Sequence, residues 1–340
     1  MSRCGIRIAC SALATLATFI VPEPGLAHNP GDFGQYQRGV TMGDPAAAAP
    51  PPGLYFENTT LFAPQITGNG QVAGIKVDAT VDIPTLIWST GWSFLGASVM
   101  AYVAQPVFNL SAWNSNVSGP PYASTFYPTV HNTWINPVSL SWNLGNGWFA
   151  SGGFALYVPD GSRYDNTANP DNWTFEPHAA VSYLANGWDM TAHLVYDFNT
   201  ASAGHAGPFA GTPAAAFGVG FRSGDQVFLD LTATKKLGNW EIGTVAYFEW
   251  QATSDRPGGG ASCAQMAAAT GSLLTCGRST DYAIGGLIGY DFGRFALKLI
   301  LTESVYTKDE IGGFAMWTKL SFPLFAPEEP AANKPLFRKN

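Results

Sequence analysis

The sequence contains little charge, and this scarcity excludes several classes of protein. Asp, Glu, Lys and Arg make up only 12% of the 340 residues, where soluble domains carry roughly 25%. The 17 basic residues are outnumbered by 24 acidic ones, so the net charge of −7 offers no basic surface for nucleic acid. No segment after the first 27 residues has the ~18 consecutive apolar residues of a transmembrane helix. With 14% aromatic residues the chain is not disordered, which leaves a β-rich protein, either soluble or in a membrane as a barrel.

Residues 1–27 have the pattern of a cleaved secretory signal. Arg3 and Arg7 precede an uncharged, mostly apolar stretch over residues 8–21, and residues 25–27 place small side chains at the positions that determine cleavage. The apolar stretch is too short to span a bilayer. We therefore expect export, with final location in the outer membrane of a Gram-negative cell if the exported chain forms a barrel.

Cysteine is scarce, and cleavage of the signal leaves only Cys263 and Cys276. Both lie in one segment rich in Gly, Ala and Ser. In an oxidising compartment we expect this pair to form a disulfide that closes a loop. Two thiolates without a nearby His do not complete a tetrahedral metal site, so neither a metal nor a cofactor is predicted.

From Gly53 onward, about twelve segments alternate apolar and polar residues with period two, which indicates strands with one apolar and one wet face. The segment that starts at Ile75 shows it: Ile75, Val77, Ala79, Val81 and Ile83 alternate with Lys76, Asp78, Thr80 and Asp82. Several segments reach ten or more residues, as transmembrane strands of ~9–11 residues do, whereas the mean globular strand has ~5–6. The predicted fold is all-β: a closed antiparallel transmembrane β-barrel of about twelve strands over residues 53–325, with ten or fourteen strands as alternatives.

Short and long connections alternate along this region. The long ones cover roughly residues 112–132, 159–172, 200–222 and 253–280. Outer-membrane barrels have short periplasmic turns and longer external loops, whereas a soluble sandwich has no reason to keep all its long loops at one end. The short ones consist of residues that tolerate positive φ: Thr90-Gly91, Gly145-Asn146-Gly147, Ala185-Asn186-Gly187, Gly238-Asn239 and Gly293-Arg294.

An aromatic residue follows each short turn. If the turns share one rim of the barrel, these rings share one height and form a girdle at the bilayer interface. The predicted girdle residues are Trp92, Trp148, Trp188, Trp240 and Phe295.

Charged residues on the polar faces are expected to point into the lumen, because a Lys or Arg facing lipid at the midplane costs ~2–4 kcal/mol. Their mixed signs predict an ion-pair network, which either supports the wall or lines a polar path. The predicted lumen-lining residues are Lys76, Asp78, Asp82, Glu176, His178, His193, Asp197, Asp230, Glu241, Glu249, Lys298 and Lys319.

The two ends of the mature chain lack strand patterns. Residues 28–52 are either a periplasmic linker or a plug inside the barrel, and we favour the linker because few apolar residues are available for docking. Residues 326–340 contain three prolines and are expected to form a disordered tail. Aromatic residues in the long connections, Trp113, Tyr127 and Trp134 among them, form either a vestibule for an aromatic solute or a core that orders the loops.

No catalytic residue is predicted. The sequence has no Gly-x-Ser-x-Gly elbow, no His-Glu-x-x-His motif and no phosphate-binding Walker loop. His178 and His193 point inward by strand parity, away from the lipid-facing surface on which an outer-membrane lipid hydrolase would act.

Four short stretches match the pattern of a known family: Pro51-Pro52-Gly53-Leu54-Tyr55, Tyr157-Val158-Pro159-Asp160-Gly161, Ser223-Gly224-Asp225 and Tyr290-Asp291-Phe292-Gly293. Through them the chain resembles, over roughly residues 50–325, the MetA-pathway phenol-degradation family. The resemblance implies an outer-membrane barrel encoded near genes for aromatic catabolism, and uptake of a hydrophobic or aromatic molecule.

The function predicted from these observations is passive uptake of small hydrophobic compounds, aromatic ones among them, by a monomeric outer-membrane barrel channel. The expected partners are outer-membrane lipid, the solute and the outer-membrane assembly machinery. Two alternatives stay open: a structural or adhesive barrel without an open pore, and an outer-membrane lipid hydrolase.

Overall fold

The structure, a computed structural model, describes residues 34–68, 75–114, 122–161, 171–202, 220–269 and 276–326. The predicted signal over residues 1–27 lies outside the described residues, as does the predicted tail beyond residue 326.

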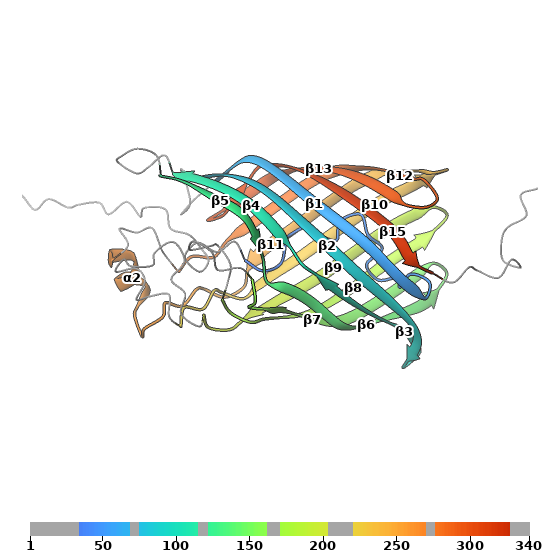
Figure 1. Ribbon diagram of the computed structural model, residues 1–340, viewed down its shortest axis with the longest axis horizontal. Coiled ribbons are helices and arrows are strands. Elements are labelled where there is room, and N and C mark those ends of the chain that lie inside the picture. Colours follow the sequence, from blue (N-terminus) through green and yellow to red (C-terminus); the bar gives the residue numbers. More distant parts are fainter. Residues whose placement is uncertain are drawn as a thin grey trace, which may run out of the picture.

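Twelve long strands form a closed barrel (Figure 1), which confirms the predicted fold class and strand number. All neighbours pair antiparallel, in the order β1, β15, β13, β12, β11, β10, β9, β8, β7, β6, β3, β2, and β2 pairs with β1 to close the ring. Their bounds are β1 Gly53–Gly68, β2 Ile75–Phe94, β3 Ala97–Ala104, β6 Thr133–Gly145, β7 Trp148–Val158, β8 Thr174–Ala185, β9 Trp188–Asn199, β10 Gln226–Leu237, β11 Trp240–Gln251, β12 Thr280–Asp291, β13 Ala296–Lys308 and β15 Phe314–Phe325.

The end of the barrel that carries the long connections also carries further elements. β4 (Val107–Asn114) and β5 (Tyr122–Val130) pair with each other and continue the lines of β3 and β6. The predicted long connection over residues 112–132 is therefore largely a β-hairpin. The two-residue strand β14 (Ile311–Gly312) pairs with the last residues of β1, and α2 (Cys263–Ala269) is the one α-helix among the described residues. None of the helical residues described forms a segment long and apolar enough to cross a bilayer.

The opposite end consists of tight turns. Asn146 and Asn186 adopt φ of 52° and 53° there, the left-handed region that Asn tolerates better than most residues. The first predicted turn is wrong: β2 passes through Thr90-Gly91 with a register irregularity and ends at Phe94, and the hairpin turns at Leu95-Gly96.

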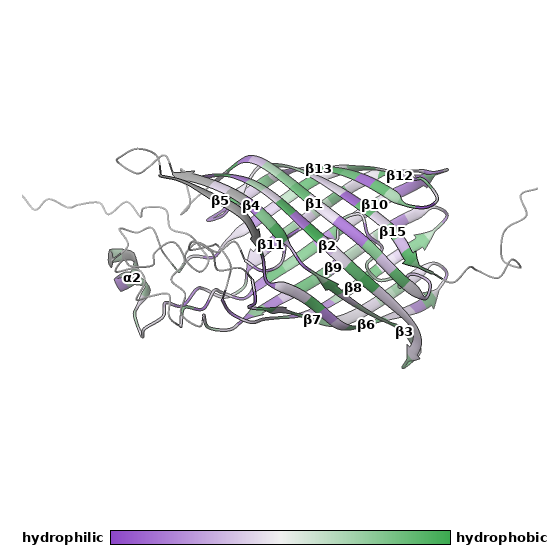
Figure 2. Cartoon of the chain, in the orientation of Figure 1, coloured by the Kyte–Doolittle hydropathy of each residue, from purple (hydrophilic) through white to green (hydrophobic). Residues whose placement is uncertain are grey.

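Hydrophobic and hydrophilic residues alternate along many of the strands (Figure 2), and neighbouring side chains of a strand point to opposite faces of the wall. On β9, Met190, Leu194 and Phe198 are exposed on the outer surface, while His193 and Asp197 are buried inside. The five predicted girdle rings, Trp92, Trp148, Trp188, Trp240 and Phe295, are all 39–65% exposed. Trp92 lies on β2 itself, with its ring 5.7 Å from that of Trp88. That these rings meet a membrane interface stays a prediction.

Cys263 and Cys276 form a disulfide, as predicted, in the external connection between β11 and β12. Because the bond closes a short loop outside the barrel, its loss should leave the barrel intact. We expect Cys263→Ser with Cys276→Ser to keep the thermal unfolding temperature of the barrel, while losing roughly 3 kcal/mol of local loop stability. Limited proteolysis followed by mass spectrometry should show faster cleavage between these two positions, and an unchanged cleavage rate would contradict the expectation.

Candidate functional site

Residues 34–50, which we call the plug, lie inside the barrel (Figure 1). The backbone N–H of Gly39 donates to Asp230 (3.0 Å), that of Gly43 to Thr232 (2.7 Å) and that of Ala47 to Ser182 (3.2 Å). The favoured linker is therefore wrong for these residues. The plug docks through hydrogen bonds from its backbone to polar side chains of the wall. The prediction failed because it considered only apolar residues as a means of docking.

Asp230 on β10 is a central attachment point of the plug. Its carboxylate accepts hydrogen bonds from the hydroxyl of Tyr36 (3.0 Å) and the hydroxyl of Thr41 (2.7 Å), besides the N–H of Gly39. Burial raises the pKa of the Tyr36 phenol, so this group stays a neutral donor. The arrangement satisfies a buried carboxylate without a cation and fixes the position of the plug against the wall.

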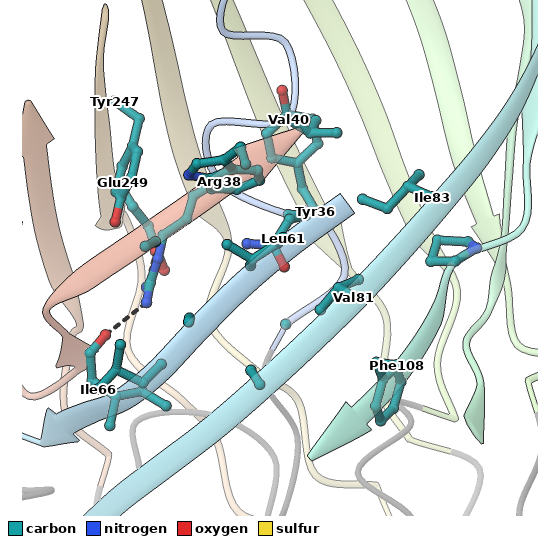
Figure 3. A pocket seen from close by; sticks show the side chains of 18 of the residues that line it. Tyr36, Arg38, Val40, Leu61, Ile66, Val81, Ile83, Phe108, Tyr247 and Glu249 are labelled. Carbon is teal, nitrogen blue, oxygen red and sulfur yellow. Dashed lines mark hydrogen bonds and ion pairs between the residues drawn. The ribbon is translucent and has the colours of Figure 1, made fainter. Parts of the chain in front are cut away.

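Arg38 attaches the plug to β11 and β12, the strands next to β10 in the wall (Figure 3). Its guanidinium lies 2.5 Å from Glu249, 3.2 Å from Asp281 and 3.5 Å from Glu310, and it also donates to the carbonyl of Ile311 (2.6 Å). Burial alone would lower the pKa of Arg38, but Glu249 and Asp281 more than offset this, so its pKa is raised and the side chain stays charged.

Two lysines of the wall contact the part of the plug around Gly43 and Asp44. Lys319 pairs with Asp44 and lies 3.9 Å from Glu57. Lys298 donates to the carbonyl of Gly43 and lies 3.2 Å from Glu241. The predicted network of mixed charges therefore exists, and it serves to fasten the plug.

Nine of the twelve predicted lumen-lining residues lie on the inner face of the wall. His178 and His193 share a hydrogen bond of 3.2 Å, and His193 also bonds the hydroxyl of the plug residue Thr41 (2.9 Å). The nine are Glu176, His178, His193, Asp197, Asp230, Glu241, Glu249, Lys298 and Lys319.

The prediction for Lys76, Asp78 and Asp82 is wrong, because β2 turns its apolar face inward. Val77 and Val81 are buried against the interior, which places the alternating charged residues on the outside. Asp82 accepts from the hydroxyl of Thr60 (2.6 Å), and Asp78 from the N–H of Gln65 (2.7 Å). These positions lie in the half of β2 that is nearer the long loops.

The inward apolar face of β2 lines a cavity of about 120 Å³ in the loop-side half of the lumen (Figure 3). We call it the outer cavity. The plug forms one wall through Tyr36, Arg38 and Val40, and β1, β2 and β4 form the other. The apolar residues that the strands contribute include Leu61, Ala63, Ile66, Val77, Ala79, Val81, Ile83 and Phe108.

A cluster of aromatic rings forms one end of the outer cavity. The indole of Trp134 stacks on Tyr157 with ring centroids 5.7 Å apart, and its edge meets Tyr36 at 5.8 Å and Tyr102 at 5.0 Å. Its N–H donates to Glu176 (3.2 Å). Trp134 thus belongs to the lumen rather than to a loop vestibule. The side chains of Trp113 and Tyr127 lie outside the described residues.

A second, larger cavity of about 610 Å³ lies on the turn-side half of the plug, and we call it the inner cavity. Its lining includes plug residues Ala46 and Pro50 and the wall residues Phe56 and Met100. Trp134 and Val40 line both cavities. The lumen therefore holds two spaces in series, separated by the plug and one indole.

A closed antiparallel barrel with an apolar exterior, aromatic rings at the turn-side rim and a polar, plugged interior is an outer-membrane-type β-barrel. The chain belongs to the family described as "Putative MetA-pathway of phenol degradation", which matches residues 63–320. No curated protein matches the chain.

Comparison with solved structures supports the fold through the first of the three that follow. An outer membrane channel from Pseudomonas putida F1 superimposes with a TM-score of 0.62 at 10% identity, covering 81% of this chain and 97% of that one. The translocator domain of the autotransporter NalP from Neisseria meningitidis gives 0.44 at 12% identity, covering 82% and 90%. The monoaromatic hydrocarbon channel CymD gives 0.41 at 9% identity, covering 90% and 99%. At these identities the likeness concerns the fold alone.

Proposed function

We propose that this protein is an outer-membrane channel for passive uptake of small hydrophobic, including aromatic, solutes. The observation that carries the proposal is the pair of cavities in series through the lumen, of about 120 and 610 Å³, with predominantly apolar linings. The lumen of an outer-membrane barrel is usually polar, so apolar cavities within this otherwise polar interior favour an apolar solute over a purely supporting role. The family's name and the description of the Pseudomonas putida structure as a channel agree with it.

The path would run from the outer cavity to the inner cavity past Trp134. Small apolar molecules need no charged group to bind, and burial of their surface supplies the driving force. The site is complete within one chain, so we propose a monomer as the working unit.

Uptake by whole cells tests this function. A strain that lacks the gene should take up radiolabelled toluene at a several-fold lower initial rate than the same strain carrying a plasmid copy. Uptake of a sugar that enters through general porins serves as the control and should be equal in both strains. Equal toluene rates would contradict the proposal and favour the structural or adhesive alternative.

Trp134→Ala should join the two cavities. Loss of a buried indole and its hydrogen bond to Glu176 is expected to destabilise the protein by about 3–5 kcal/mol and to increase single-channel conductance in a planar bilayer. Trp250→Ala is the matched control, since Trp250 lies on the opposite face of the wall, alternating with the buried Glu249. An unchanged conductance in a folded Trp134→Ala protein would show that this indole does not separate the cavities.

A further inference from the structure

We infer that the outer cavity is a binding site for an uncharged single-ring hydrocarbon and that it rejects aromatic carboxylates. This inference rests on the proposed function and deepens it by naming the solute class and the place where the solute binds.

The size of the outer cavity fits one ring. Its volume of about 120 Å³ is comparable with an apolar cavity of ~150 Å³ that stays free of water and binds benzene. A two-ring hydrocarbon would require the plug or the wall to move. The single-ring solute is therefore the largest aromatic ligand that the cavity accepts without rearrangement.

The walls match such a ring in chemistry. Ala63, Ala79 and Val81 are buried on the strand side, and they present methyl groups to the cavity. Phe108 and Tyr157 both contact the His131 ring, at centroid distances of 5.5 and 6.2 Å with edge-on geometry. Edge-to-face contact with aromatic rings adds about 0.5–1.5 kcal/mol per pair to the burial of a ring.

The charges beside the outer cavity argue against an anion. Among the described residues that line it, Arg38 is the one Lys or Arg, and Glu249, Asp281 and Glu310 already surround its guanidinium. One positive and three negative groups leave an excess of negative charge around Arg38, beside the outer cavity. The His131 imidazole packs between apolar rings, an environment that favours its neutral form. A benzoate would meet repulsion and find no free cation, whereas toluene meets only the apolar walls.

Methyl NMR of the full chain in lipid nanodiscs tests the inference, with alanine methyl groups labelled. The inward methyls of Ala63 and Ala79 report the cavity, and the outward methyls of Ala179 and Ala192 report nonspecific partition into lipid. Toluene should shift the inward signals saturably, with an affinity about tenfold or more above that of benzoate. Ala79→Phe should abolish the inward shifts by filling the cavity, and Ala192→Phe, on the outer face, should not.

A charge variant tests the reason for the selectivity. Glu310→Gln keeps the shape of the side chain and removes one negative charge, so benzoate should bind several-fold more tightly while toluene binding stays the same. Equal affinities of toluene and benzoate in the wild-type protein would overturn the inference and leave uptake of aromatics intact. Toluene shifts confined to the outward methyls would overturn it as well. If toluene binds as described and yet cellular uptake does not depend on the protein, the site stands and the proposed channel function fails.

Discussion

Arg38→Met should release the loop-side half of the plug and raise single-channel conductance several-fold. Arg38 is the cation that Glu249, Asp281 and Glu310 share, and all three carboxylates are buried. Removal of one partner of a buried ion pair typically costs about 3–5 kcal/mol, because the remaining charges lose their compensation. Entry of water and ions relieves the repulsion among the carboxylates, and the plug must move to admit them.

Planar-bilayer recording measures the conductance, and circular dichroism confirms that the barrel has folded. Arg256→Met is the matched control: its exposed side chain belongs to the external connection, and its described contacts are backbone hydrogen bonds to Arg222. Arg38→Lys should give an intermediate conductance, because an ammonium keeps the charge but lacks the planar fork of donors that reaches several acceptors at once. A folded Arg38→Met barrel with wild-type conductance would show that the ion cluster does not hold the plug.

The strands of the wall could be predicted because lipid imposes a simple rule on their outer faces. On β9, every second residue from Trp188 to Phe198 is apolar or aromatic, and the structure forms a strand over Trp188–Asn199. Closure of the sheet could also be predicted, because in a bilayer only a closed sheet pairs all of its backbone N–H and C=O groups. The tight turns at Asn146 and Asn186 were predicted correctly, because few residue types adopt the left-handed φ that such turns require.

Period-two alternation identifies two faces but does not say which face points inward. On β2 the alternation was recognised, and the polar face was assigned to the lumen because charges are costly in lipid. The structure reverses this, since Val77 and Val81 pack toward the plug and Asp82 bonds Thr60 on the outside. An apolar face that points inward needs another apolar surface or an apolar solute in the lumen. The alternation along β2 alone does not show that the plug lies there.

The plug itself is the part of the candidate site that the sequence concealed. Its contacts with the wall combine backbone groups with scattered polar side chains, and these form no periodic pattern. Among the side chains are Tyr36, Arg38, Thr41 and Asp44. The wall residues that receive them, Asp230 and Glu249, were predicted to face the lumen. Carboxylates outnumber lysines among the predicted lumen-lining residues, and this was a signal that some of them have partners elsewhere in the chain, as Glu249 has in Arg38.

Gly39→Val is the second change expected to displace the plug. Gly39 has φ of +82°, where a β-branched residue is strained, and a Cβ there would lie 2.7 Å from Met42 and 3.0 Å from Tyr247. Strain at such a backbone position costs roughly 1–3 kcal/mol, and overpacking adds a similar amount. Because the N–H of Gly39 also bonds Asp230, movement of this residue removes an anchor of the plug.

Gly293→Val separates the two contributions. Gly293 has nearly the same φ, +83°, but nothing lies within 4 Å of its added Cβ, so it shares the backbone strain and lacks the crowding. We expect Gly39→Val alone to raise conductance several-fold and to admit a thiol reagent to a cysteine introduced at Val40, which lines both cavities. If Gly293→Val opened the channel equally, strain anywhere in the chain would suffice. If neither variant changed conductance, the plug would tolerate a side chain at Gly39, and its close fit between Met42 and Tyr247 would have no part in closing the lumen.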